Sequence, residues 1–289
     1  MIQPALQDEA FLANVADTRA TIAADRLVLW WLGQSGFLVR HAGEFLLFDP
    51  YLSDSLTKKY AATDKPHVRL TARVVDPARL DFVNVVTSTH NHTDHLDVET
   101  LAPLFAAAPR AKLVLPAANV DFAAQRLGES ARSRFVPLAE GARTTVGVFS
   151  FEAVPAAHEE FSPEFAGYVV SVGPFRIYHS GDTVPFPGQV ERLRPFGIDL
   201  ALLPINGRAP ERRVSGNLDG PEAARLAHGI GARWVVPCHY EMFAFNTASP
   251  APFVAECARL GQRSAVLRAG ERWVLPWGVR PHFRSSLPP

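Results

Sequence analysis

The feature that most constrains this chain is a cluster of imidazoles and a carboxylate directly after an apolar run. The run is Phe82–Ser88 (FVNVVTS), whose β-branched residues favour a buried strand. The residues that follow place four potential metal ligands within six positions: His90, His92, Asp94 and His95. In extended backbone His90 and His92 point to the same side, and a turn after them brings the other two back toward that point.

Imidazole and carboxylate together suit zinc or another first-row divalent ion. The alternative interpretation is a polar loop that is rich in His by chance. The chain has only ten His, and chance rarely packs three of them this closely with an Asp between. The pattern therefore predicts a metal site at the end of a strand.

Three more potential ligands follow other predicted strands. His158 comes after the apolar run 151–155, Asp182 follows 176–179, and His239 ends the run 234–237. In α/β architectures the carboxyl ends of buried strands gather the functional site. Each residue alone is weak evidence, but together with the first cluster they fill two coordination spheres.

The order of predicted elements indicates an α/β fold. Strands are predicted at 27–31, 37–41, 44–48, 82–88, 112–115, 148–154, 168–172, 176–179, 200–204, 234–237, 265–267 and 272–275. Helices are predicted at 11–24, 97–107, 118–127, 221–228 and 250–260. Strands first cluster and then alternate with helices, and this pattern recurs, which predicts two packed sheets with helices outside (αββα). The polar segment 54–74 is predicted as a surface excursion, and the sequence leaves open whether it covers the site.

Composition limits the classes of partner that the chain is expected to bind. Lys plus Arg equals Asp plus Glu at 29 each, so no net charge attracts nucleic acid or an anionic membrane. Two cysteines allow no disulfide framework. The first ten residues carry no Lys or Arg, and no apolar run approaches the roughly 18 residues of a membrane span. We expect a cytoplasmic protein that acts on a small molecule and binds neither nucleic acid nor membrane; its oligomeric state cannot be read from the sequence.

The series His-x-His-x-Asp-His, a later His, a Gly-Asp and a final His resembles the motifs of the metallo-β-lactamase superfamily. Within it, the chain is most similar to the ascorbate-6-phosphate lactonase (UlaG-like) group, through Leu29–Gly33, Tyr178–Asp182 and Val235–His239. The resemblance covers residues 27 to 278 and implies a metallo-β-lactamase-like fold. It also implies one hydrolase domain, 27–289, on which an N-terminal extension, 1–26, packs.

The resemblance implies a division of the ligands. His90, His92 and His158 would hold one divalent ion; Asp94, His95 and His239 would hold the other; and Asp182 would bridge them. Zinc is the first expectation for both ions, with manganese or iron as alternatives. Such a pair generates hydroxide from a shared water near neutral pH, and Asp94 would orient that nucleophile and accept its proton. Asp49 would brace the ligand loop from behind.

Four weaker candidates lie near the predicted ligands. His179 could support Asp182 from outside the coordination sphere, although packing in the core explains it equally well. Asn206 and Arg208 follow the strand 200–204 and could bind a substrate anion, or belong to a solvated loop. Tyr240 could donate a hydrogen bond to substrate.

The leading functional hypothesis is hydrolysis of a small ester, lactone or amide, of the UlaG-like lactonase type. The alternative is a phosphodiesterase that acts on a small or lipid phosphodiester. Diiron redox chemistry is disfavoured, because the proteins of this fold that perform it generally carry Glu where this chain has His92. A metal-free binding scaffold is disfavoured because no ligand position is missing.

Overall fold

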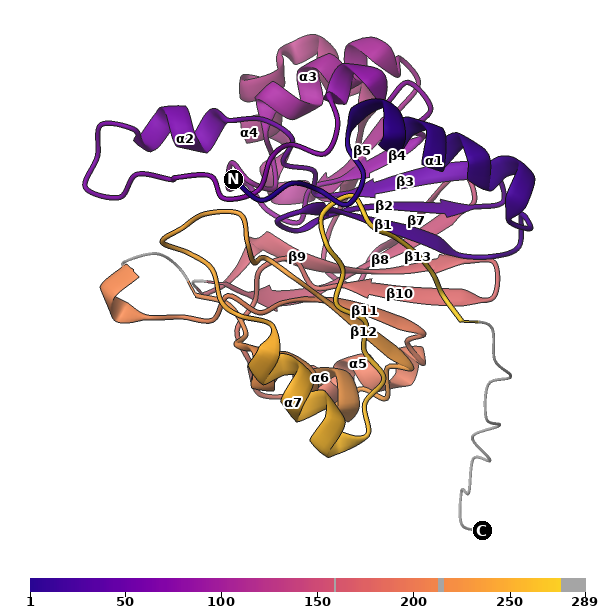
Figure 1. Cartoon of the computed structure of the whole chain (residues 1–289). Coiled ribbons are helices and arrows are strands. Elements are labelled where there is room, and N and C mark those ends of the chain that lie inside the picture. Colours follow the sequence, from indigo (N-terminus) through magenta and orange to yellow (C-terminus); the bar gives the residue numbers. More distant parts are fainter. Residues whose placement is uncertain (159, 213–215, 277–289) are drawn as a thin grey trace.

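The computed structural model describes residues 1–158, 160–212 and 216–276. Within them, two mixed sheets pack face to face and helices cover the outer face of each (Figure 1). Over the first sheet lie α1 (Asp8–Thr21), α3 (Val98–Ala107) and α4 (Val120–Leu127). Over the second lie α5 (Gln189–Leu193), α6 (Gly220–Gly229) and α7 (Ala251–Leu260). The predicted α/β sandwich is confirmed.

Each sheet combines a parallel and an antiparallel part. The first has the order β13 (Arg272–Val274), β1 (Val28–Gly33), β2 (Gly36–His41), β3 (Glu44–Phe48), β4 (Val85–Thr87), β5 (Lys112–Pro116) and β6 (Phe135–Leu138). The second has the order β12 (Trp234–Cys238), β11 (Leu200–Pro204), β10 (Phe175–His179), β9 (Phe161–Val172), β8 (Phe149–Ala157) and β7 (Arg143–Val146). Strands β3 to β6 and β10 to β12 run parallel.

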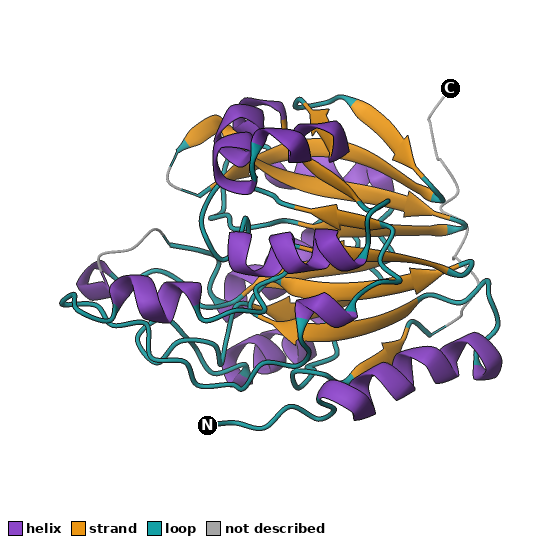
Figure 2. Cartoon of the chain, turned by 90° about the horizontal axis from the view of Figure 1, so that it is seen from above, coloured by secondary structure: helices purple, strands orange, loops and turns teal. Residues whose placement is uncertain are grey.

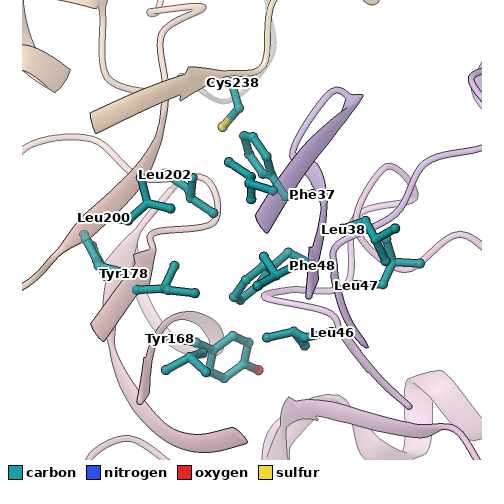
Figure 3. Close-up of a cluster of buried hydrophobic side chains, with 14 of the residues drawn as sticks. Phe37, Leu38, Leu46, Leu47, Phe48, Tyr168, Tyr178, Leu200, Leu202 and Cys238 are labelled. Carbon is teal, nitrogen blue, oxygen red and sulfur yellow. The ribbon is translucent and has the colours of Figure 1, made fainter. Parts of the chain in front are cut away.

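Central strands of the sandwich are apolar along their whole length because both of their faces are covered. All six residues of β1 and all five of β11 are buried. Between the sheets, Phe37 and Phe48 of the first meet Tyr168 and Tyr178 of the second (Figure 3). This continuous core fixes how the two sheets dock, and therefore how loops from the two sheets meet.

The long loops gather at one end of the sandwich, beside the short helix α2 (Ser55–Tyr60), as Figure 2 shows. Helix α2 begins the excursion 54–74. This excursion is joined to the loop after β12 by backbone hydrogen bonds from Leu70 N to Met242 O (2.8 Å) and from Ala244 N to Val68 O (3.0 Å). The excursion is therefore anchored along part of its length.

The structure corrects several sequence predictions. The predicted strand 265–267 is wrong: only an isolated bridge joins Ser264 to Val235 there. Strand β4 is shorter than the predicted 82–88. Strands β6 and β7 and helices α2 and α5 were not predicted. No helix among the described residues is long and apolar enough to cross a membrane.

The N-terminal segment packs against the first sheet. Phe11 and Val15 of α1 are buried, and the Phe11 ring meets the edge of Trp30 at a centroid distance of 6.4 Å. The division of the chain at residue 26 stays a prediction, and its far boundary at 289 lies outside the described residues.

Candidate metal centre

The first part of the centre is the loop after β4, which Asp49 holds from behind. Asp49 follows β3 and is completely buried. Its Oδ2 accepts hydrogen bonds from Thr89 N (3.1 Å) and His95 Nδ1 (2.8 Å), and its Oδ1 accepts one from Thr87 Oγ1 (2.6 Å). Since Nδ1 of His95 is used in this way, its Nε2 is the atom left to face the centre.

Beyond the loop, Asp97 accepts a hydrogen bond from Glu99 N and begins α3, as predicted. Between β4 and that helix the chain turns tightly, with His95 N donating to His92 O at 3.0 Å. The turn brings His95 and Asp94 back toward His90, which is the geometry that the residue spacing required.

The second sheet supplies the remaining three residues from three strand ends. His158 follows β8, and His239 follows β12. Asp182 lies beyond the end of β10, with Ser180 and Gly181 between. His158 is oriented by a hydrogen bond of 3.1 Å between its Nδ1 and Gly216 O. His239 has a φ of 63°, and its N donates to the carbonyl of Gln34 in the first sheet at 3.0 Å. The centre therefore lies where the two sheets meet.

The seven predicted ligands come together in overlapping groups whose donor atoms lie within 4.8 Å of one another. We call His90, His92 and His158 the first triad, and Asp94, His95 and His239 the second triad. A third group, His90, His95 and Asp182, joins them.

Asp182 lies between the triads. Its Oδ2 is 3.7 Å from His158 Nε2 and 3.2 Å from His239 Nε2, and its Oδ1 is 3.3 Å from His95 Nε2. Donor atoms bound to one ion at about 2.1 Å lie roughly 3.0 to 3.5 Å apart. The carboxylate thus has the position that a bridging ligand requires.

Unsatisfied polar atoms show that these residues fit a metal. Nε2 of His90, Nε2 of His95 and Oδ1 of Asp182 are buried without a hydrogen-bond partner among the described residues. Buried polar atoms without partners are costly, so a cluster of them needs an explanation. Divalent ions bound to neutral imidazoles and carboxylates would satisfy all three.

Electrostatics at the centre favour a cation. Burial opposes ionisation of Asp182, yet His239 and His95 lower the pKa of this carboxyl well below its usual range. Burial also opposes the charged form of His95, but Asp182 and Asp94 raise its pKa well above the ordinary value. Burial and the neighbouring His95 lower the pKa of His90, which keeps it in the neutral form that binds metal. The carboxylates thus draw positive charge to this place.

A cavity of about 670 Å³ opens over the centre. The lining from the centre is Gln34, His92, Asp94, His158, Asp182 and His239. Much of its wall is apolar and comes from α2, α4, the excursion and the loop after β12: Leu56, Tyr60, His67, Phe122, Phe243 and Phe245. Two cations, Lys59 and Arg126, also line it. The excursion 54–74 therefore forms part of the wall.

Sequence reasoning missed Gln34, which is buried and lies beside the second triad. It occupies the turn Gly33-Gln34-Ser35-Gly36 between β1 and β2, where a polar residue gives no signal. Its contact with residue 239 depends on how the sheets dock.

The residues predicted to contact substrate do not line the cavity. Tyr240 does not line the cavity: its ring stacks on Trp31 at 4.4 Å and its hydroxyl donates to Leu267 O. Arg208 forms two hydrogen bonds of 2.7 Å with Glu222 and does not line the cavity. Asn206 is buried and donates a hydrogen bond to Asn246. Of these two residues, Asn246 is the one that lines the cavity.

His179 is a core residue. Its Nε2 donates to Ser35 O at 3.1 Å, and its ring stacks on Phe48 at 4.8 Å between the sheets. Among the described residues no hydrogen bond joins His179 to a predicted ligand, and its observed contacts are those of packing in the core. Asp49, by contrast, has the bracing contacts expected of it.

The sandwich and its His/Asp cluster define a metal-dependent hydrolase of the metallo-β-lactamase fold. Residues 45–240 match the beta-lactamase superfamily domain, and the chain belongs to this family. It is 30% identical over 254 residues to a UPF0173 metal-dependent hydrolase of Opitutus terrae, covering 84% of this chain and 97% of that protein.

Solved structures show the same fold. Igni18, a metallo hydrolase from Ignicoccus hospitalis, superimposes with a TM-score of 0.65 at 20% identity, covering 88% of this chain and 100% of that one. An isothiocyanate hydrolase from Delia radicum gut bacteria superimposes with a TM-score of 0.67 at 18% identity, covering 85% of this chain and 98% of that one.

Proposed function

We propose that this protein is a binuclear hydrolase that cleaves a small ester, lactone or amide. The observation that carries the proposal is the place of Asp182, with one carboxylate oxygen near His158 and His239 and the other near His95. A single ion would use one triad and leave the other without a function. Two ions that share Asp182 use both.

In this proposal the first triad (His90, His92 and His158) holds one ion, and the second triad (Asp94, His95 and His239) holds the other. Nitrogen and carboxylate donors favour zinc, with manganese or iron as alternatives. When bound, such a pair supplies a nucleophile at neutral pH and polarises the bond to be cleaved.

Asp94 is the proposed catalytic residue of the chain. It lines the cavity, and its side chain keeps 16% of its exposure while most of the other ligands are buried. Its Oδ2 lies 3.5 Å from His239 Nε2 within the second triad, so its second oxygen would orient the nucleophile and accept the proton. The aromatic wall would exclude water from the reacting bond.

Cavity chemistry supports a substrate that is apolar and carries an anionic group. Among the described residues, the carboxylates that line the cavity are Asp94 and Asp182, which the proposal gives to the metals. Within the described residues neither Lys59 nor Arg126 forms an ion pair, so both cations are available to a substrate. A carboxylated ester or lactone of the UlaG-like lactonase type fits this lining.

The same two cations favour a second candidate, a small or lipid phosphodiester. Its negative charge would lie against Lys59 and Arg126, and its apolar part against Phe243 and Phe245. A panel of lactones and carboxylated esters, assayed beside bis(p-nitrophenyl) phosphate, separates the two candidates by which one is turned over.

The binuclear site is tested by metal content. Protein purified without chelator and offered zinc or manganese should contain about two ions per chain by plasma mass spectrometry. Asp182→Ala should lose at least one, whereas Asp199→Ala removes a buried carboxylate that does not line the cavity and should lose none. Turnover should vanish with chelator and return with metal. Near-zero metal in the parent protein would overturn the proposal.

A further inference from the structure

Gln34 is held rigidly at the junction of the two sheets. Its φ of 49° lies in the left-handed region that residues other than glycine rarely adopt. Its carbonyl accepts hydrogen bonds from Trp31 Nε1 and from His239 N, both at 3.0 Å. Only 1% of the residue is exposed, yet it lines the cavity. A strained polar residue fixed in this way is typical of a functional site.

The Gln34 amide lies against two donor atoms of the second triad. Its Nε2 is 2.7 Å from Asp94 Oδ2 and 3.0 Å from His239 Nε2. Those two donor atoms are themselves 3.5 Å apart. Neighbouring ligands of one ion with bonds of about 2.1 Å are separated by roughly 3.0 to 3.5 Å. The end of this side chain thus lies close to the position of another ligand, with its contact to Asp94 slightly shorter than that range.

The other atom of the amide, Oε1, is buried without a hydrogen-bond partner among the described residues. The oxygen and nitrogen of a glutamine amide have nearly the same size and shape, and rotation about the last side-chain bond exchanges them. An N–H group suits Asp94 and His239 while their lone pairs are free. Once those lone pairs bind a cation, the oxygen is the atom that suits this place.

We propose that the Gln34 amide oxygen is an additional ligand of the ion held by the second triad. The inference rests on the proposed binuclear function, which does not itself require Gln34. Amide oxygens are neutral donors that divalent ions accept alongside carboxylates and imidazoles. The second triad then offers Asp94, His95, His239 and Gln34, beside the shared Asp182.

The test is cobalt binding to three variants, measured by chelator competition and by the visible spectrum. Gln34→Ala removes the donor, and Gln34→Glu keeps an oxygen and adds charge. Gln189→Ala is the control, because it removes a buried glutamine that does not line the cavity. All three are first compared with the parent by circular dichroism.

We expect Gln34→Ala to weaken the binding of one of the two cobalt ions about tenfold or more. Its cobalt absorption should also grow stronger, because cobalt absorbs more strongly at a lower coordination number. Gln34→Glu should bind at least as tightly as the parent, and Gln189→Ala should match it.

Unchanged or tighter cobalt binding in Gln34→Ala would overturn this inference alone. If the amide only blocked the position of the ion, its removal would make cobalt bind more tightly. A parent protein that binds fewer than two cobalt ions would overturn the binuclear proposal and this inference with it. Should Gln34→Ala fail to fold, weaker cobalt binding by Gln34→Glu than by the parent decides against the inference.

Discussion

Asp49 Oδ2 lies 2.8 Å from His95 Nδ1, and neither side chain is exposed to solvent. The hydrogen bond fixes the ring so that Nε2 faces Asp94 and Asp182. Thr89, on the same loop, also bonds to Asp49 through its backbone N–H. One carboxylate therefore orients both a proposed ligand and the loop that carries it.

Replacing this carboxylate should release metal without unfolding the protein. In Asp49→Asn the amide cannot hold His95 and the Thr89 N–H with the same charge-assisted bonds. We expect metal affinity to fall by roughly 10- to 100-fold, the usual effect of losing a partner that orients a ligand. Chelator competition measures the change, with Asp199→Asn as the control. Equal affinities in the two variants would contradict the assigned role.

Arg69 should anchor the excursion 54–74. Its side chain is only 7% exposed, and it donates to Asp54 Oδ1 (2.9 Å) and Ser53 O (2.8 Å). Its guanidinium also lies over the Tyr51 ring at 5.4 Å. Arg69→Ala leaves the carbonyl of the buried Ser53 without this donor, at a cost of roughly 1 to 3 kcal/mol.

The measurement for Arg69→Ala is limited trypsin digestion, because α2 carries the exposed Lys58 and Lys59. Cleavage after these residues should be at least severalfold faster than in the parent. Arg73→Ala serves as the control, since its side chain is 44% exposed and pairs with exposed Asp76. Equal cleavage of the two variants would show that other contacts hold the excursion.

The two cavity cations should discriminate in favour of anionic substrates. Removing either Lys59 or Arg126 should lower kcat/KM for a carboxylated ester by roughly two- to fivefold, the usual range for one exposed charge. A neutral ester of the same shape should be unaffected, and 0.5 M salt should narrow the difference.

Lys58→Ala is a matched control for the cavity cations. Lys58 precedes Lys59 in α2, but it pairs with Glu99 at 2.7 Å and does not line the cavity. If Lys58→Ala reduces turnover of the anionic ester as much as Lys59→Ala does, the effect comes from general surface charge, and the cavity assignment is wrong.

Protonation of His67 at low pH should weaken its packing against the aromatic side chains of the cavity wall. Its ring stacks on Tyr60 at 4.2 Å and meets Phe243 and Phe245 edge-on. Burial lowers the pKa of His67 below 6.5, although the Lys65 carbonyl and Asp94 oppose the shift. His67 binds a proton more readily when the excursion 54–74 is open than when it is packed. The stability of the packed excursion, complete above pH 6.5, therefore declines as the pH falls below 6.5.

Hydrogen exchange of residues 54–74 at pH 5.5 and 7.5, corrected for intrinsic rates, measures this effect. The parent should open severalfold more often at pH 5.5. His67→Phe keeps an aromatic ring that cannot accept a proton, so its opening should not depend on pH in this range. The same pH dependence in His67→Phe would assign the effect to another group.

Residues whose environment follows from local pattern were predictable. The strands before His90 and His239 are apolar runs, and these two residues and Asp182 all follow strand ends as expected. Strand β7 was missed because its residues alternate between exposed and half-buried, as at an edge. Strand β6 contains Pro137, which weakens a strand pattern.

Side-chain direction after a strand was not predictable in the same way. His239 and Glu241 both have positive φ, so the chain turns back and places Tyr240 on Trp31 rather than over the cavity. The role of Gln34 depends on contact with a residue 205 positions away. Such contacts follow from the docking of the sheets, which no local pattern encodes.

The proposed ligands come from both sheets, and this couples metal supply to the lifetime of the protein. His90 and His95 belong to the first sheet, while Asp182 and His239 belong to the second, so each bound ion would tie the halves together. Anything that binds only the folded form slows loss through opening and proteolysis. We expect cells starved of metal to degrade this protein faster, so that its abundance would itself report on metal availability.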